Sequence, residues 1–109
     1  MSPSEPACLA RVYGAALAAA ASPGMAADVT GHVLAGRPHD DEDALVARAI
    51  RLAVRGAPHP SFAPMAPDDR EAVALVRLGG CADSEAARVL GTDVAEVRRR
   101  LARGLRALA

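Results

Sequence analysis

The sequence predicts an all-α protein, a small helical bundle of about six helices that ends in a helix-turn-helix. Alanine, leucine and arginine are strong helix formers and are abundant among its 109 residues, whereas the only aromatic residues are one Phe and one Tyr. Apolar residues recur at steps of three and four along much of the chain, as they do on one face of a helix. A chain of this length makes one domain or two very small halves.

Three helices are expected in the first half of the chain. The first covers residues 5–21, and the second follows Ser22, a candidate N-cap, with Pro23 at its first position. The third, residues 39–56, begins with acids and ends with arginines, which suits the helix dipole, and Gly56 is the natural residue to close it. The inward residues expected for these helices are Leu9, Val12, Tyr13, Ala16, Leu17, Met25, Val29, Val33, Leu34, Leu45, Val46, Ala49, Ile50, Ala53 and Val54.

The second half of the chain begins after a proline-rich linker at residues 57–66, where the prolines are expected to prevent any regular element. Residues 67–80 form a helix that a proline opens and two glycines close. Residues 82–91 and 94–109 follow as two helices joined by a tight turn, with a glycine ending the first and Asp93 capping the second. This arrangement is typical of a helix-turn-helix.

The last helix carries five arginines and a single acid, Glu96. Its outer side is expected to combine the small Ala95 with most of the arginines, which can bind phosphates or the edges of guanines. Asp93 and Glu96 lie at the end that would enter a DNA groove, where an acid repels phosphate unless it accepts a hydrogen bond from a cytosine amino group. The alternative is a bundle helix with a solvated arginine face. The expected inward stripe is Val94, Val97, Leu101, Leu105 and Leu108.

Other classes of function find little support in the sequence. No run of about 18 apolar residues predicts a membrane span, and no signal peptide is expected. Cys8 and Cys81 are far apart and are interpreted as free thiols of a cytoplasmic protein. The acids from Asp40 to Asp43 are assigned to helix capping rather than to a cation site. The histidines have no cysteine or carboxylate at ligand spacing, so no metal, cofactor or catalytic residue is expected.

From Pro67 to Leu108 the sequence PDDREAVALVRLGGCADSEAARVLGTDVAEVRRRLARGLRAL resembles region 4 of the extracytoplasmic-function (ECF) sigma factors. Members of that family share a proline, an acidic pair and REA, an apolar helix, a glycine, EIAEVLG and a capped helix similar to V..VKSRLARGR..L. Here Ala82 replaces the usual Ser or Thr N-cap, so Asp83 or Ser84 is expected to cap the helix. The matching positions are Arg70, Glu71, Ala72, Gly80, Glu85, Ala87, Val89, Leu90, Gly91, Val97, Arg100, Leu101 and Arg103.

The resemblance implies a domain that recognises the −35 element of a promoter and contacts the flap of RNA polymerase. Glu96 departs from the family pattern, in which a Thr is common at this position. Arg98, Arg99, Arg100 and Arg103, carried over by position, become the DNA-contact candidates, and Ala95, Glu96 and Arg106 join them on the same helix.

The first half of the chain is similar, more faintly, to region 2 of the same family. The segment VYGAALAAAASPGMAADVTGHVLAG resembles LYRLALRLLGDREDAEDVTQEVFLRAW, and Asp28, Val29 and Thr30 keep part of an acidic stretch near the polymerase clamp contact. These three residues are the polymerase-contact candidates. Opening a promoter requires pockets for unstacked bases, and Tyr13 and Phe62 are the only aromatic residues available for them.

The sequence thus divides into a degenerate region 2-like segment of three helices at 1–56, the linker at 57–66 and a region 4-like domain at 67–109. It predicts a bacterial, cytoplasmic, sigma factor-like transcription regulator without enzymatic activity. The expected partners are promoter DNA and the RNA polymerase core, with an anti-sigma factor as a further partner and no membrane. The alternative is a sigma mimic or adaptor that binds an anti-sigma factor or polymerase without reading DNA; the zero net charge and Glu96 favour it, and the arginine cluster disfavours it.

Overall fold

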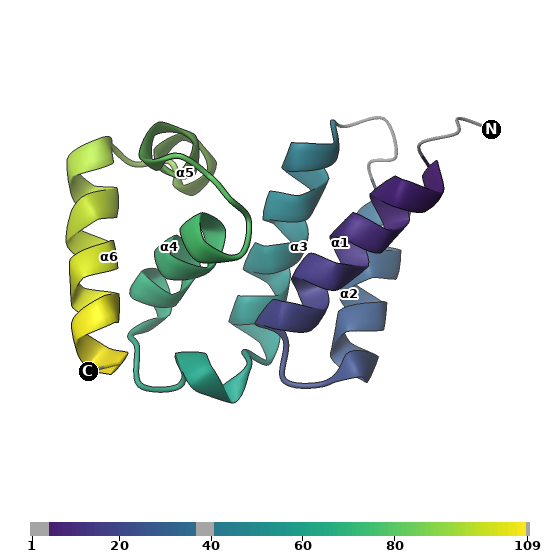
Figure 1. Ribbon diagram of the computed structural model, residues 1–109, viewed down its shortest axis with the longest axis horizontal. Coiled ribbons are helices and arrows are strands. Elements are labelled where there is room, and N and C mark those ends of the chain that lie inside the picture. The colour runs from purple at the N-terminus through teal and green to yellow at the C-terminus, as the bar shows by residue number, and fades with distance from the viewer. Residues whose placement is uncertain (1–4, 37–40, 109) are drawn as a thin grey trace.

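The computed structural model describes residues 5–36 and 41–108, and these residues form an all-α fold as predicted (Figure 1). Their only strand-like feature is a single isolated bridge between Ala20 and Pro58. The expected start of the third helix at residue 39 lies outside the described residues. The helices are α1 (Glu5–Ala19), α2 (Pro23–Gly36), α3 (Glu42–Gly56), the short 3₁₀ helix η1 (Pro60–Phe62), α4 (Pro67–Arg77), α5 (Asp83–Leu90) and α6 (Val94–Leu108).

Local capping explains where the first helices begin and end. The hydroxyl of Ser22 accepts a hydrogen bond from the backbone N–H of Met25 at 3.2 Å, which confirms Ser22 as the N-cap of α2. Asp41 accepts from the N–H of Ala44 at 2.8 Å and caps α3 in the same way. Gly56 does not close α3 in a left-handed conformation; it is the last helical residue, and the N–H of Ala57 still bonds to Ala53.

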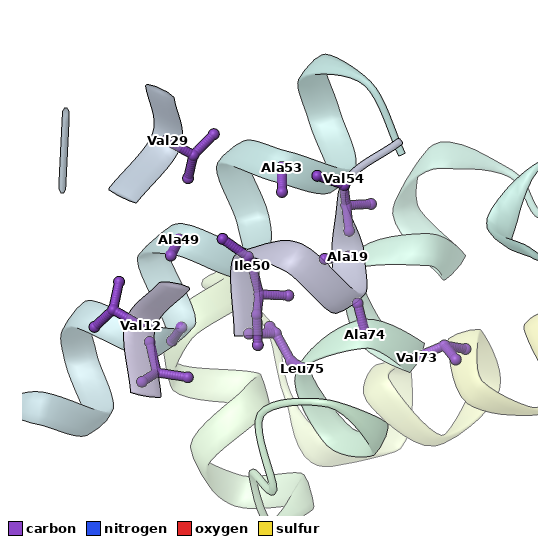
Figure 2. Close-up of a cluster of buried hydrophobic side chains, with 14 of the residues drawn as sticks. Val12, Ala19, Val29, Ala49, Ile50, Ala53, Val54, Val73, Ala74 and Leu75 are labelled. Atoms are coloured by element: carbon purple, nitrogen blue, oxygen red, sulfur yellow. The ribbon is translucent and has the colours of Figure 1, made fainter. Parts of the chain in front are cut away.

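Two groups of three helices lie along the long axis of a molecule measuring 43 × 28 × 18 Å. In Figure 1, α1 and α2 occupy one end, α6 occupies the other, and α3 and α4 meet in the middle. One hydrophobic core runs through both groups, with the fully buried Ile50 of α3 and Leu75 of α4 near its centre (Figure 2). The two halves of the sequence therefore pack as one body.

The segment 57–66 is packed against the protein rather than extended between the halves, which corrects the expectation that it holds no regular element. It forms η1, and its backbone pairs with the end of α1, where His59 donates to Ala19 at 2.8 Å and Ala57 accepts from Ala21 at 2.7 Å. Phe62 and Met65 are buried in the core. Prolines prevent a long helix, but they permit a single 3₁₀ turn that begins at Pro60.

The inward face of α1 agrees with the prediction at Val12 and Ala16 but differs from it at two leucines. Leu9 and Leu17 are 50% and 40% exposed. The side of α1 that faces α2 and α3 buries Val12 and Ala16, as predicted, together with further alanines. Because alanines occur all around this helix, the periodicity of the leucines does not determine which face is buried, and the small alanine side chains allow the neighbouring helices to approach closely. The buried positions of this side are Val12, Ala16, Ala19 and Ala20.

Candidate nucleic-acid interface

A tight turn joins α5 to α6. Gly91 adopts the left-handed conformation with φ of 67°, as a glycine at a helix C-terminus commonly does, and the N–H of Thr92 bonds to the carbonyl of Ala87 at 2.9 Å. Asp93 then accepts a hydrogen bond from the N–H of Glu96 at 2.7 Å and starts α6. Both residues have the roles expected of them, and together they confirm the helix-turn-helix.

The start of α5 differs from the prediction, because neither Asp83 nor Ser84 caps it. Ala82 occupies the N-cap position and has no side-chain acceptor, while the carboxylate of Glu85 accepts from the N–H of Ala82 at 3.3 Å. Half of a capping box thus replaces the usual Ser or Thr. Asp83 is left free to interact with a neighbouring helix, and it pairs with Arg98 of α6.

The face of α6 that packs against the rest of the protein consists of the fully buried Val97, the partly buried Val94 and Leu101, and Gly104. A Cβ atom at Gly104 would lie 2.6 Å from Cγ2 of Val73 in α4, so α6 packs here with its backbone close to α4.

Leu105 and Leu108, which are predicted to face the core, are instead 44% and 49% exposed. The buried face of α6 is therefore shorter than the predicted apolar stripe, and it includes Gly104 in place of the last two leucines.

The outer side of α6 is open at one end of the molecule, away from α1, α2 and α3 (Figure 1). The side chains of Arg98, Arg99 and Arg103 are 70%, 60% and 46% exposed. Ala95 and Arg106 are exposed as well, whereas Arg100 is largely covered. Six of the seven predicted DNA-contact residues thus share one accessible surface of the helix, although Glu96 is partly covered. The seventh, Arg100, lies at the margin of this surface.

Four of the five arginines pair with acids of the same chain. Glu96 accepts from Arg99 at 2.9 Å and from Arg100 at 3.2 Å, and its carboxylate lies 3.5 Å from Nη2 of Arg103. Ion pairs also connect α6 to its neighbours. These are Arg98 with Asp83 of α5 at 3.0 Å and Arg103 with Asp69 of α4 at 3.2 Å.

These contacts shift two ionisation equilibria in the direction that keeps the groups charged. Hydrogen bonds from Arg99, and next from Arg100, lower the pKa of Glu96 below its usual range. The hydrogen bond to Asp69 raises the pKa of Arg103. The surface therefore carries fixed charges of both signs at neutral pH, with arginines in the majority. Within the described part of the chain, Arg106 makes no ion pair.

Asp69 and Asp83 are partners of the arginines that the sequence did not identify. Asp69 is 5% exposed although it lies in the first turn of α4, where an acid is readily explained by the helix dipole. The spacing of Asp69 gives a sequence signal for this contact. Asp69 precedes Val73 by four residues, so it shares the face of α4 that packs against α6.

The three polymerase-contact candidates lie on α2, at the other end of the molecule. Asp28 is exposed, but Val29 and Thr30 are buried, and the Thr30 hydroxyl donates to the carbonyl of Ala26 at 2.8 Å. Of the two aromatic residues, Phe62 is buried and Tyr13 is half-buried. Only Asp28 among the three candidates thus offers its side chain to a partner.

Residues 64–108 match the model of the family described as sigma-70, region 4. These C-terminal helices are a sigma-70 region 4 domain. The match begins at Pro64 and so includes Met65, whose sulfur lies near Gly104 of α6. Such a domain indicates a sigma factor-like role in DNA binding and association with RNA polymerase. Searches among curated proteins and among solved structures gave no match. The likeness of residues 1–56 to region 2 stays a prediction.

Two further classes of site have no counterpart in the part of the chain that the structure describes. Residues 5–36 and 41–108 hold no cluster of three or more His, Cys, Asp or Glu side chains arranged to bind a metal ion. None of the helices in these ranges has the length and apolarity that a membrane span requires. Cys8 and Cys81 are both unpaired, and burial raises the pKa of the Cys81 thiol.

Proposed function

We propose that this protein is a transcription regulator of the ECF sigma factor type, acting in the bacterial cytoplasm, which binds a −35-type promoter element through α6 and associates with the RNA polymerase core. The observation that carries the proposal is the position of α6. It follows a tight helix-turn-helix turn in a region 4 domain and presents Arg98, Arg99 and Arg106 at the open end of the molecule. In a helix-turn-helix, the second helix enters the major groove with its N-terminal residues against the base edges.

The acids around α6 are compatible with this role. Exposed ion pairs contribute little to stability and exchange readily with solvent, so a phosphate can replace the carboxylate of Asp83 as the partner of Arg98. Arg106 makes no ion pair within the described residues, so it can contact a phosphate without displacing a carboxylate. Arg103 is less available to DNA, because it forms an ion pair with the buried Asp69 of α4. We therefore assign base and phosphate contacts first to Arg99, Arg98 and Arg106, and a supporting role to Arg103.

A selection experiment tests the proposal and requires no known promoter. Randomised DNA duplexes are enriched on the purified protein, and the affinity for the enriched duplex is then compared between the wild type and Arg99→Ala. We expect one enriched sequence and a loss of about tenfold in affinity for the variant. Arg11→Ala removes the same charge from α1, far from α6, and is expected to bind as the wild type does.

A second function, that of an adaptor which binds polymerase or an anti-sigma factor without reading DNA, is favoured by one observation. Glu96 is surrounded by three of the five arginines of α6 and offsets part of their charge. Titration of the purified polymerase core with the protein, with and without the enriched duplex, separates the two functions. The adaptor is supported if the core binds the protein tightly while no duplex is enriched at any salt concentration. The first proposal is then wrong.

A further inference from the structure

Glu96 is the only acid within α6, and it lies in the first turn of that helix. A carboxylate in that position is unfavourable for a helix that only binds phosphates, because it repels the DNA backbone. Its side chain nevertheless contacts three arginines of the same helix, and it is only 25% exposed. A carboxylate held in a fixed position at the groove-facing end of a recognition helix is suited to accept a hydrogen bond from a base.

The contacts of the two carboxylate oxygens differ. Oε2 lies 2.9 Å from both Nε and Nη2 of Arg99, so two nitrogens of this guanidinium share one carboxylate oxygen. Oε1 accepts from Nε of Arg100 at 3.2 Å and lies 3.5 Å from Nη2 of Arg103. An ionised carboxylate has about four acceptor sites, so these contacts occupy all of them.

One of the four sites can be released at little cost. The contact between Oε1 and Arg103 is the longest of the set, and Nη2 of Arg103 is also 3.2 Å from the buried carboxylate of Asp69. Arg103 therefore keeps an ionic partner when it leaves Glu96. The site that opens on Oε1 can then take a donor from the major groove, while Arg99 stays paired with Oε2.

The chemistry of the groove identifies that donor. Cytosine presents an N4 amino group, which is the usual partner of a glutamate, whereas the amino group of adenine lies beside the N7 acceptor, which repels a carboxylate. Arg99 retains N–H donors that can bind O6 and N7 of a guanine. Adjacent base pairs are separated by about 3.4 Å, so two side chains in direct contact, such as Glu96 and Arg99, can reach neighbouring base pairs.

From this geometry we propose that Glu96 selects a cytosine at the base pair next to the one contacted by Arg99, and that Glu96 holds the Arg99 guanidinium in position for its own base. The inference rests on the proposed binding of DNA by α6. The arginines keep Glu96 ionised at neutral pH, as the lowered pKa of its carboxyl group indicates, so that it serves as an acceptor and not as a donor.

Selection from randomised duplexes with three proteins tests the inference. The wild type is expected to enrich a cytosine at one position, with discrimination on the order of tenfold against the other bases. Glu96→Gln is expected to exchange this cytosine for adenine, because a glutamine amide pairs with N6 and N7 of adenine. Asp68→Asn removes one negative charge from an exposed position of α4 and is expected to enrich the same sequence as the wild type.

A shortened acid separates base recognition from charge. Glu96→Asp keeps the charge but withdraws the carboxylate by one methylene, so we expect the cytosine preference to be lost while the dependence of affinity on salt stays that of the wild type. The inference is overturned if Glu96→Gln binds every duplex more tightly by one common factor and keeps the preferences of the wild type. If the wild type enriches no sequence at all, the proposed function fails and this inference fails with it.

Discussion

The two ends of the molecule are built from different contacts. At one end, α1, α2 and α3 pack through alanine and valine side chains, and the ion pairs of Arg11 with Glu42 and Asp43 lie at the surface. At the other end, α4, α5 and α6 share the apolar core but are also connected by charged side chains, with Asp69, Asp83 and Glu96 all directed to arginines of α6. Under the proposed function, the first group serves as a support and the second presents a surface to a charged partner.

The interface between the two groups, called the seam below, combines apolar and ionic contacts. Ile50 and Leu75 are fully buried there, and the buried Glu71 of α4 pairs with Arg55 of α3. Arg51 of α3 reaches further and donates to the carbonyl of Val89 in α5 at 3.1 Å. Because this seam is continuous with the core on either side, we expect the support and the binding surface to fold as one unit.

The largest expected effect is that of Ile50→Ala, which removes buried volume where the two groups meet. Truncation of a fully buried isoleucine costs about 2–5 kcal/mol of unfolding free energy. Denaturation followed by circular dichroism should show one transition at a lower midpoint. The exposed Leu9→Ala should change the stability by no more than about 0.5 kcal/mol. Two separate transitions in the wild type would contradict the single core.

The next effect concerns the ionic part of the seam. Glu71→Ala removes a buried carboxylate and leaves Arg55 and Arg51 facing the space it occupied, so we expect a loss of about 1–3 kcal/mol in unfolding free energy. Glu42→Ala is the control, because it breaks an exposed pair at the surface of the support and should cost about 0.5 kcal/mol or less. Equal losses in urea titrations of the two variants would show that the seam depends on apolar packing alone.

A pair of glycine substitutions compares the packing of the two groups directly. Gly104→Ala places a methyl group 2.6 Å from Val73 and 3.2 Å from the sulfur of Met65, so it should lower the unfolding free energy by about 1–2 kcal/mol even after the gain in helix propensity. Gly31→Ala meets nothing within 4 Å and should raise it by about 0.5–1 kcal/mol. Thermal melts with changes of the same sign would refute the close contact of α6 with α4.

The smallest effect is a pH dependence at Glu96. Its folded-state pKa is lowered, so the stabilisation from its ion pairs is present above the ordinary glutamate pKa and is lost as the pH falls through the folded value. Wild type and Glu96→Gln should therefore differ in Tm at pH 7 and converge at the acid end of a titration. A difference that grows with acidity would have the wrong sign.

These comparisons also explain how much of the protein could be predicted from its sequence. The helix-turn-helix follows from Gly91 and Asp93, whose backbone roles depend on neighbouring residues alone. The burial of α1 and the exposure of Leu105 depend on how closely alanines and Gly104 let other helices approach, and this is a property of the assembled core. For the same reason, the sequence does not reveal that Asp69 and Asp83, which come from other helices, pair with arginines of α6.

The affinity of α6 for DNA tests the central claim most directly. Fluorescence anisotropy with the enriched duplex, measured at several salt concentrations, would compare the wild type with Arg99→Ala/Arg106→Ala and with the charge-matched Arg11→Ala/Arg48→Ala. The account predicts that the α6 double variant loses at least about tenfold in affinity and shows a shallower salt dependence, by about one for each phosphate contact removed. The variant in α1 and α3 should bind as the wild type does. Equal affinities and equal salt slopes for all three proteins would contradict the assignment of α6 as the DNA-binding helix.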